Sequence, residues 1–474
     1  MGLELRLCGR DGVRETHFQM NPLEKGMNST HMYKSKSTKH HKLFIIGAGA
    51  SGLMAAVNAR DRGIDTAIIE SNDRVGKKVL TTGNGRCNIT NQSTATGTDE
   101  AANLFTKYHS NQAEFPLPVL QQFGVRQTVD FFNTLGLPLT AIENGRMYPM
   151  SLQAASVLEV FRIALEDRNV PIYFKTKVLD VTVSKEHPRF TIQCQSEEEG
   201  EVIYTSDYLF LCTGGLTAPK TGTDGSGYTL AQRLGHTLID PVPGIVQLKL
   251  DSPYLKDLSG VKFEGWGHII VNGEIIRSEY GEVLFTNYGA SGPPILQLSR
   301  KAAYQLGRGE TVTLSLDMMP DRTEEEVVDF FDTHWGMFGH RTVAASLIGI
   351  LNKKLIPVLL KEAGIDDQDQ NMLCQDLSWK TRKALCRLMK HWDFIVTDTN
   401  GFPNAQTTAG GIDTTELKEG TLESKLVPGL YLAGEVMDVD GDCGGYNLQW
   451  AWSSGYSAAV ALAEQLASTM EKGG

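Results

Sequence analysis

The sequence contains no C-x-x-C pair and no long apolar run, and each absence excludes a class of protein. The seven cysteines are scattered and odd in number, which is typical of free thiols in a reducing compartment. Without two neighbouring thiols the chain lacks the dithiol centre of a disulfide reductase. No stretch approaches the roughly 20 apolar residues of a membrane span. We therefore expect neither a dithiol mechanism nor a membrane partner.

An excess of positive charge is also missing. The chain has 45 Lys and Arg against 56 Asp and Glu, a net charge of −11, whereas nucleic-acid binding needs a basic face. We expect a small-molecule substrate and no nucleic-acid partner; the oligomeric state is not indicated.

Residues 1–41 show no periodicity, and residues 1–40 carry no secretory signal. We therefore expect a disordered N-terminal extension and a cytoplasmic protein.

A short apolar run, Phe44–Ile46, leads into a glycine pattern of the form G-x-G-x-x-G. In this pattern the first glycine permits a tight turn, the second admits a pyrophosphate, and the third lets the helix pack closely on the strand. Thr66–Ile69 predicts a second strand, which ends in an acid where a ribose-binding carboxylate belongs. The segment therefore predicts a dinucleotide site that includes Gly47, Gly49, Ala50, Ser51, Gly52 and Glu70.

Two further strands end in glycine. Tyr208–Cys212 is continuously apolar, as in a buried parallel sheet. Gly429–Ala433 is followed by glycine and an acid, and an Ala-rich helix begins at about Gln449. A helix starting there can direct its N–H groups at an electron-rich ligand edge. The contacts predicted from these segments are Thr213, Gly214, Gly215, Gly434, Glu435, Asp438, Gly445, Tyr446, Asn447 and Leu448.

The region between these parts has a different pattern. Short alternating runs with glycine turns follow residue 241 and predict an antiparallel sheet or small barrel. Residues 321–390 are predicted to be helical. We divide the chain into a dinucleotide-binding domain (42–240 and 403–474), a β-barrel insert (241–320 and 391–402) and a helical subdomain (321–390).

The motifs resemble those of one family, the BaiN-type (YhiN-like) FAD-dependent oxidoreductases, also labelled aminoacetone oxidases. The resemblance runs from about Leu43 to Leu462. It is carried by the glycine pattern, Gly83-Asn84-Gly85-Arg86-Cys87-Asn88, Leu432-Ala433-Gly434-Glu435, and the segment from Gly444 to Gly455. It implies an α/β fold in which a glutathione-reductase-like, FAD-binding Rossmann domain is interrupted by a β-barrel domain with a small helical subdomain.

The resemblance also implies that FAD is the cofactor and extends the predicted site. Arg86 would be a countercharge to the FAD pyrophosphate, and Lys77 and Lys78 are further candidates. The additional predicted contacts are Lys78, Gly83, Gly85, Arg86, Cys87, Asn88 and Val178. We predict no metal site, because Asp438–Asp442 fails the calcium-loop template: Cys443 stands where the turn glycine belongs.

The activity implied by the family is NAD(P)H-driven reduction of an enone or carbonyl-bearing small molecule, bile-acid-like in relatives, by hydride transfer through flavin N5. The sequence has no second full G-x-G-x-x-G domain, so NADH or NADPH is expected to act as a transient donor. Where relatives have Phe-Thr-His, this chain has Phe285-Thr286-Asn287, and Asn287 cannot serve as an acid–base near neutral pH as histidine can. Tyr288 and Tyr446 are hypothetical proton donors; simple packing explains them equally well.

Two other functions stay open at this point. One is a flavin-dependent amine or aminoketone oxidase that uses oxygen and would release peroxide without NAD(P)H. The other is a flavin-binding module in RNA modification or redox sensing, against which the acidic charge balance argues.

Overall fold

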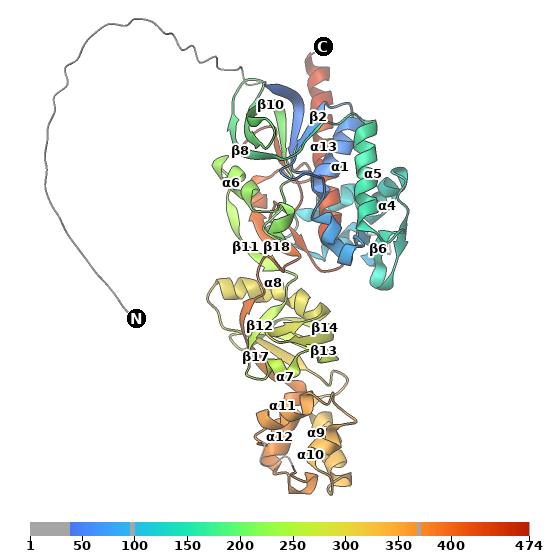
Figure 1. The fold of residues 1–474 in the computed structure, drawn as a ribbon, viewed down its shortest axis with the longest axis vertical. Helices are drawn as coiled ribbons and strands as arrows, with labels where there is room; N and C mark the ends of the chain where they lie inside the picture. Colours follow the sequence, from blue (N-terminus) through green and yellow to red (C-terminus); the bar gives the residue numbers. More distant parts are fainter. Residues whose placement is uncertain (1–37, 95–99, 367–370, 474) are drawn as a thin grey trace, which may run out of the picture. The chain divides into compact units, whose positions relative to one another are not determined.

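The computed structural model describes residues 38–94, 100–366 and 371–473. Its main sheet has the strand order β7-β2-β1-β10-β9-β8, and β19 pairs with the end of β10 (Figure 1). The pairs β1–β2, β1–β10, β2–β7 and β10–β19 are parallel, whereas β8 and β9 form an antiparallel meander with β10. The strands are β1 (Lys39–Ile46), β2 (Thr66–Ile69), β7 (Ile172–Tyr173), β8 (Thr176–Val183), β9 (Phe190–Ser196), β10 (Gly200–Leu211) and β19 (Leu430–Leu432).

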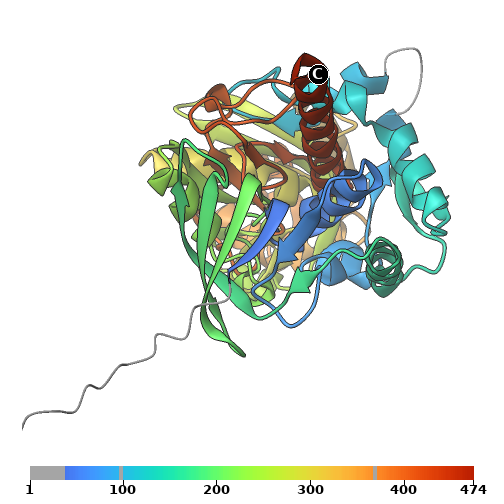
Figure 2. The ribbon, with the colours of Figure 1, turned by 90° about the horizontal axis from the view of Figure 1, so that it is seen from above.

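The central strands are apolar on both faces because both faces are covered. Leu43 to Ile46 are all buried, as expected of a parallel sheet with helices on it. Helices α1 (Ala50–Asp61) and α13 (Tyr446–Gly473) pack side by side, and α5 (Ala154–Asp167) contacts α1 (Figures 1 and 2). The first and last parts of the chain therefore build one domain.

Smaller elements of this domain surround the sheet. They are η1 (Val79–Gly85), β3 (Thr90–Asn91), η2 (Gln92–Thr94), α2 (Glu100–Phe105), β4 (Tyr108–His109), α3 (Pro116–Gln122), α4 (Val125–Thr134), β5 (Leu139–Ala141), η3 (Glu143–Gly145), β6 (Arg146–Pro149), η4 (Pro219–Thr221), α6 (Ser226–Arg233), η7 (Thr414–Glu416) and β20 (Asp440–Gly441).

The insert contains a closed barrel of order β12-β15-β14-β13-β16-β17. Its core includes Val283, Phe285, Leu314, Trp392 and Phe394, all buried. The elements are β12 (Leu248–Asp251), α7 (Leu255–Leu258), β13 (Lys262–Val271), β14 (Glu274–Thr286), β15 (Gly289–Ser291), α8 (Pro293–Gly307), β16 (Val312–Asp317) and β17 (Trp392–Thr399).

The helical segment lies between β16 and β17 in the chain. It comprises α9 (Glu324–Met337), α10 (Val343–Leu347), α11 (Leu355–Glu362), η6 (Cys374–Asp376) and α12 (Trp379–Lys390). Helix α9 begins at a capping box in which Thr323 accepts from the Glu326 amide and Glu326 accepts from the Thr323 amide, which satisfies two otherwise unpaired donors.

Two predicted boundaries need correction. The fold begins at Lys39 rather than at residue 42, because Lys39, His40 and His41 pair with Tyr204, Thr205 and Ser206 of β10. Backbone pairing does not require apolar side chains, so the polar start of this strand gave no signal. Residue 241, the predicted start of the insert, lies within β11 (Leu238–Gly244), which pairs with β18 (Thr407–Ile412). This two-stranded ribbon carries the chain into and out of the barrel. The rest of the predicted extension, residues 1–37, lies outside the described residues.

Candidate functional site: a dinucleotide cavity at the strand ends

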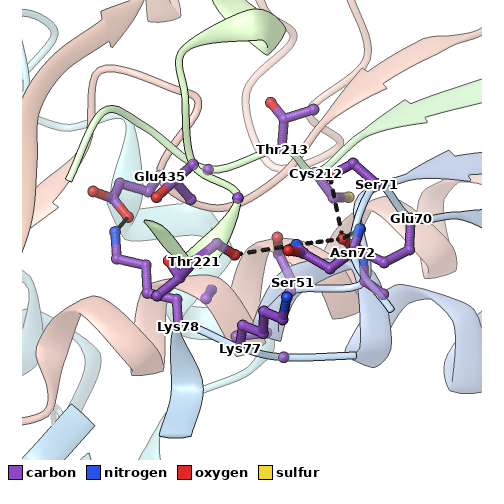
Figure 3. Close-up of a pocket in the computed structure, with 18 of the residues that line it drawn as sticks. Ser51, Glu70, Ser71, Asn72, Lys77, Lys78, Cys212, Thr213, Thr221 and Glu435 are labelled. Carbon is purple, nitrogen blue, oxygen red and sulfur yellow. Dashed lines mark hydrogen bonds and ion pairs between the residues drawn. The ribbon is translucent and has the colours of Figure 1, made fainter. Parts of the chain in front are cut away.

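A cavity of about 260 Å³ lies where β1, β2 and β10 end and α1 and α13 begin (Figure 3). This is the edge at which open α/β sheets bind ligands, because the carboxyl ends of parallel strands meet helix N-termini there. Of the predicted contacts, those that line it are Gly49, Ala50, Ser51, Glu70, Lys78, Val178, Thr213, Gly214, Glu435, Asn447 and Leu448.

The glycine turn between β1 and α1 is too tight for side chains at two positions. Gly47 has φ +100°, and a Cβ on it would lie 2.5 Å from the carbonyl oxygen of Cys212; a Cβ on Gly52 would lie 2.0 Å from the carbonyl oxygen of Gly47. At Gly49, by contrast, a Cβ would meet nothing closer than 4.0 Å. No side chain caps α1 at Gly49, so the N–H groups of its first turn are available to an anionic group.

Glu70 follows β2 and ties the glycine turn to the next loop. Its Oε2 accepts from the Ala48 amide at 2.8 Å, and its Oε1 accepts from the amide and the side chain of Asn72, both at 2.7 Å. Asn72 also donates to the carbonyl of Thr221 at 3.1 Å, which joins this loop to the segment after β10 (Figure 3). Oε1 thus accepts two short hydrogen bonds, whereas Oε2 accepts one and has a second lone pair, so Glu70 keeps acceptor capacity at Oε2.

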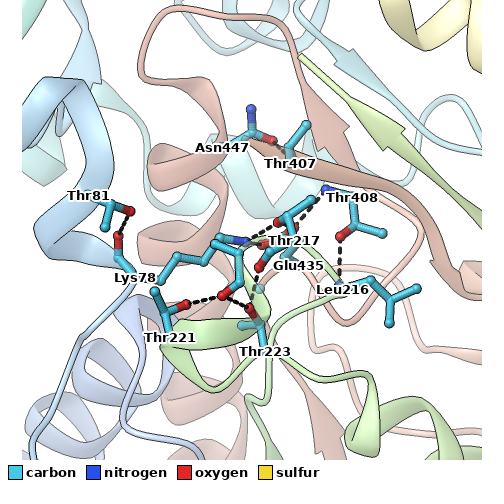
Figure 4. A network of polar contacts seen from close by, with 12 residues as sticks. Lys78, Thr81, Leu216, Thr217, Thr221, Thr223, Thr407, Thr408, Glu435 and Asn447 are labelled. Atoms are coloured by element: carbon cyan, nitrogen blue, oxygen red, sulfur yellow. Dashed lines mark hydrogen bonds and ion pairs between the residues drawn. The ribbon is translucent and has the colours of Figure 1, made fainter. Parts of the chain in front are cut away.

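A polar network around the lining residues Lys78 and Glu435 forms part of the cavity wall (Figure 4). Lys78 Nζ lies 2.5 Å from Glu435 Oε2 and 2.6 Å from Thr217 Oγ1. Glu435 Oε1 accepts from Thr217 at 3.0 Å and from the Thr408 amide at 2.7 Å. Burial would raise the pKa of Glu435, but the Lys78 charge and these hydrogen bonds outweigh it and lower that pKa. The carboxylate is therefore ionised and held in one orientation.

The start of α13 forms the far wall. Asn447 and Leu448 line the cavity, and the Asn447 side chain is fixed by the backbone of Gly441 on both sides: Gly441 N donates to Oδ1 at 2.9 Å, and Nδ2 donates to the Gly441 carbonyl at 2.8 Å. Thr407 Oγ1 donates to the same Oδ1 at 3.1 Å. The first turn of a 28-residue helix therefore faces the cavity with its polar side chain oriented.

One residue of the cavity lining has a hydroxyl without a partner. Thr213 Oγ1 is buried and makes no hydrogen bond among the described residues, although Thr213 lines the cavity. Buried polar atoms are rarely left unpaired. The Thr213 hydroxyl lies against Gly227 of α6 and is too buried to reach a ligand. An uncapped helix start, Lys78 and two oriented carboxylates match the phosphates, ribose and polyol of a flavin dinucleotide, so the residues present fit FAD.

Other predicted contacts do not line the cavity. Gly47, Gly52, Gly215 and Gly434 support the surrounding turns, and Gly83, Gly85, Arg86, Cys87, Asn88, Asp438, Gly445 and Tyr446 are outside the lining. Arg86 lies over the ring of Tyr148, 5.0 Å from its centroid, while Lys77, Lys78 and Lys177 supply cations to the cavity. Burial raises the pKa of the Cys87 thiol to about 12, which leaves it protonated and unreactive.

The candidate catalytic residues are not brought together at this cavity. Asn287 is exposed, and the Tyr288 hydroxyl accepts from Asn400 Nδ2 at 3.3 Å. The Tyr446 side chain is buried, and burial raises its pKa. Asp438 accepts from the Asn111 amide at 2.7 Å, and burial raises its pKa to about 6. The roles of Tyr288 and Tyr446 in proton transfer stay predictions.

Several lining residues were not predicted. Thr221 and Thr223 flank Gly222 in a glycine-rich stretch that follows β10, so attention to its hydroxyls could have found them. Gln406 and Trp450 gave no local signal because strand pairing and helix packing bring them to the cavity. The unpredicted polar and aromatic lining residues are Ser71, Asn72, Thr82, Thr176, Lys177, Thr221, Thr223, Asp224, Ser226, Gln406 and Trp450.

No group of three or more His, Cys, Asp or Glu in the described ranges is placed to hold a metal ion. Within residues 38–94, 100–366 and 371–473, no helix has the length and apolar character needed to cross a membrane.

Comparison with known proteins adds independent information. The family model for the HI0933-like protein Rossmann domain matches residues 41–461. The chain is 39% identical over 427 residues to a 3-dehydro-bile acid delta(4,6)-reductase of Clostridium scindens, covering 90% of this chain and 100% of that protein. It is 30% identical over 420 residues to a ribosomal RNA dihydrouridine synthase of Escherichia coli, covering 88% of this chain and 97% of that protein.

Among solved structures, a flavocytochrome c3 fumarate reductase in an open conformation aligns with a TM-score of 0.47 at 14% identity, covering 90% of this chain and 79% of that one. A likeness at this level carries no functional conclusion. The family match spans both the dinucleotide-binding part and the insert. The chain therefore belongs to the HI0933-like family, and its predicted membership of the BaiN-type (YhiN-like) FAD-dependent oxidoreductases is confirmed.

Proposed function

We propose that this protein is an FAD-dependent oxidoreductase that reduces a carbon–carbon double bond conjugated to a carbonyl group in a small molecule, with NADH or NADPH as electron donor. The observation that carries the proposal is the cavity at the strand ends, in which an uncapped helix start, the Lys78–Glu435 pair and the start of α13 converge. Bound FAD supplies two-electron chemistry that amino-acid side chains lack.

The chain's own groups divide the binding task. The first-turn amides of α1 and the Lys78 ammonium would hold the diphosphate, because both present positive potential to it. Glu70 would accept from ribose hydroxyls, and Glu435 from the hydroxyls of the ribityl chain. Asn447 and the N-terminal end of α13 would face the ring system, where positive potential favours an anionic reduced state.

The relatives support the type of bond that is reduced. A delta(4,6)-reductase of a 3-dehydro bile acid acts on double bonds near a 3-oxo group, and dihydrouridine is uridine with its ring double bond reduced. The double bonds near the 3-oxo group and the ring double bond of uridine are both conjugated to a carbonyl group, which makes the carbon atom far from that carbonyl electrophilic. The greater identity to the bile-acid enzyme and the net charge of −11 favour a small enone over RNA as the substrate of this chain.

The test is an anaerobic titration of the purified protein with NADH and then NADPH, followed in the visible spectrum. A flavin spectrum that bleaches with one coenzyme, and recovers on adding a 3-oxo steroid enone with a gain of two hydrogens in the product, is the expected result. No flavin spectrum after reconstitution with FAD would overturn the cofactor assignment. Peroxide release with an amine and no coenzyme would favour the oxidase alternative.

A second candidate function, reduction of uridine in ribosomal RNA, is favoured by the Escherichia coli relative. The same reduced protein, offered a ribosomal RNA fragment, distinguishes it. Reoxidation by RNA and not by the enone would replace the small-molecule substrate with RNA.

A further inference from the structure

A charged cluster joins the insert to the dinucleotide-binding part. Arg300, on α8, donates through Nε to Asp440, with distances of 2.9 and 2.7 Å to the two carboxylate oxygens. The Arg300 side chain is 14% exposed and that of Asp440 is 2% exposed. Helix α8 packs against both β11 and the barrel strands β13 and β14. The pair therefore lies where the two parts of the chain meet.

A second arginine of the insert contacts the same segment. Arg277, on β14, lies 3.0 Å from Asp442 and 2.7 Å from Glu279. Asp442 also lies 3.0 Å from His109 of β4. The segment from Asp438 to Asp442, which includes β20, is thus held by two cations of the insert and by backbone pairing of β20 with β4 of its own domain.

This segment is linked directly to the cofactor cavity. Gly441, the residue after Asp440, forms two of the three hydrogen bonds that orient the Asn447 side chain, and Thr407 donates the third. Asn447 lines the cavity, whereas Arg300 and Asp440 do not. A chain of contacts therefore runs from the insert through Arg300, Asp440 and Gly441 to Asn447.

We propose that Arg300 is a positioning residue: its ion pair with Asp440 holds Gly441 in place, and Gly441 orients Asn447 toward the bound flavin. The proposal rests on the proposed FAD function. It assigns to the insert a role in shaping the cofactor cavity, exerted across the domain contact by a side chain that does not touch the cofactor.

Removal of the Arg300 charge has a defined consequence. Asp440 is buried, and burial raises its pKa. Without Arg300 the ionised carboxylate of Asp440 has lost its arginine partner. The protonated carboxyl can stay buried, whereas the ionised carboxylate moves toward water. The other ionisable groups that act on Asp440 or the segment around it are Lys301 and Tyr304 of α8, Arg277 of β14, His109 of β4, Tyr228 of α6, Asp413, Cys443 and Tyr446, and Asp438 and Asp442 of the same segment.

The first experiment measures the FAD dissociation constant of the wild type, Arg300→Met and the double variant Arg300→Met/Asp440→Asn between about pH 6 and pH 8. We expect Arg300→Met to bind FAD about tenfold more weakly near the upper limit, the loss of about one hydrogen bond, and to approach the wild type toward the lower limit. The double variant should lose this pH dependence, because it contains no unpaired carboxylate. Since Asp438, Asp442 and His109 are unchanged in both variants, their difference reports Asp440.

Arg308→Met is the matched control, because Arg308 is the exposed residue that ends the same helix; it should bind FAD like the wild type. Hydrogen exchange of the apo proteins provides a second measurement, with faster exchange expected at the start of α13 in Arg300→Met and not in Arg308→Met. If Arg300→Met does not fold, Arg300→Lys is tested in its place. The losses of FAD affinity and of exchange protection at the start of α13 should then have the same direction and be smaller. A wild type that binds no FAD would overturn the proposed function; equal affinity and equal exchange in all variants would overturn the positioning role alone.

Discussion

In the dinucleotide-binding part, three strands end in polar residues that surround a cavity, whereas the barrel strands of the insert close on aliphatic and aromatic side chains. Glu70, Thr213 and Glu435 each follow a strand of the first part and face the cavity. Phe285, Trp392 and Phe394 fill the barrel, with ring centroids 4.9 to 5.7 Å apart. Parallel strands place their carboxyl ends at one edge of the sheet. Neighbouring strands of an antiparallel barrel run in opposite directions, so their carboxyl ends are divided between the two ends of the barrel. The polar cavity therefore belongs to the first part, and the interior of the barrel is filled by its own apolar core.

The largest expected effect is a substitution in the glycine turn. Gly52→Val should cost more than about 4 kcal/mol of unfolding free energy or prevent folding, because its Cβ would lie 2.0 Å from a backbone oxygen. Chemical denaturation followed by circular dichroism measures the loss. Gly307→Ala on α8 is the control in the insert: nothing lies within 4 Å of its Cβ, and we expect equal or slightly higher stability. Equal stability of Gly52→Val and the wild type would contradict the close approach.

The next effect tests whether barrel packing and cofactor binding are separable. Phe285→Ala leaves a cavity at a fully buried ring and should cost about 3 to 5 kcal/mol of unfolding free energy. The FAD affinity of the folded protein should stay within about twofold of the wild type, as isothermal titration below the unfolding temperature can measure. A parallel loss of FAD affinity would show that the barrel core also shapes the cavity.

Within the cavity, Lys78→Met should weaken FAD binding about tenfold to a hundredfold, because it removes charge-assisted bonds. In the wild type the pKa of Glu435 lies below its ordinary value of 4.5. The ionised carboxylate therefore adds to the free energy of unfolding above that pH, and this contribution is lost as the pH falls. In Lys78→Met the charge that offset burial is gone, so burial raises the pKa of Glu435. The free energy of unfolding of this variant should instead fall as the pH rises.

Two measurements separate the roles of Lys78. ADP carries the diphosphate without the ribityl chain, so an equal loss of ADP and FAD affinity would assign Lys78 to the diphosphate. A loss confined to FAD would assign it to the orientation of Glu435. The variant Lys78→Met/Glu435→Gln should lose the reversed pH dependence; if the dependence persists, another group is responsible.

The smallest expected effect is that of Tyr288→Phe. Tyr288 does not line the cavity, and its hydroxyl has a single contact, to Asn400. We expect the rate at which an enone reoxidises the reduced protein to change by less than about twofold, because the change removes one long, part-buried hydrogen bond outside the cavity. Stopped-flow absorbance measures this rate. A large decrease, with FAD binding unchanged, would instead identify Tyr288 as a proton donor and place the insert at the reaction centre.

Local patterns in the sequence were sufficient for much of the first part. The turn after β1, the acid after β2 and the Ala-Gly-Glu end of β19 each depend on a few neighbouring residues, since a strand, a tight turn and a helix start are local structures. The barrel was predicted as an antiparallel sheet or small barrel for the same reason. The polar start of β1 was missed because its pairing with β10 is a long-range backbone contact.

What the sequence by itself determined is therefore the set of turns and helix starts that can meet a dinucleotide, together with the family. Only the tertiary structure decided which cations reach the cavity, that Lys78 pairs with a carboxylate 357 positions away, and that Arg300 of the insert meets Asp440. The physical reason is that glycine conformations and strand patterns are encoded within a few residues. Ion pairs and cavity walls, in contrast, form between segments that the sheet brings together from distant parts of the chain.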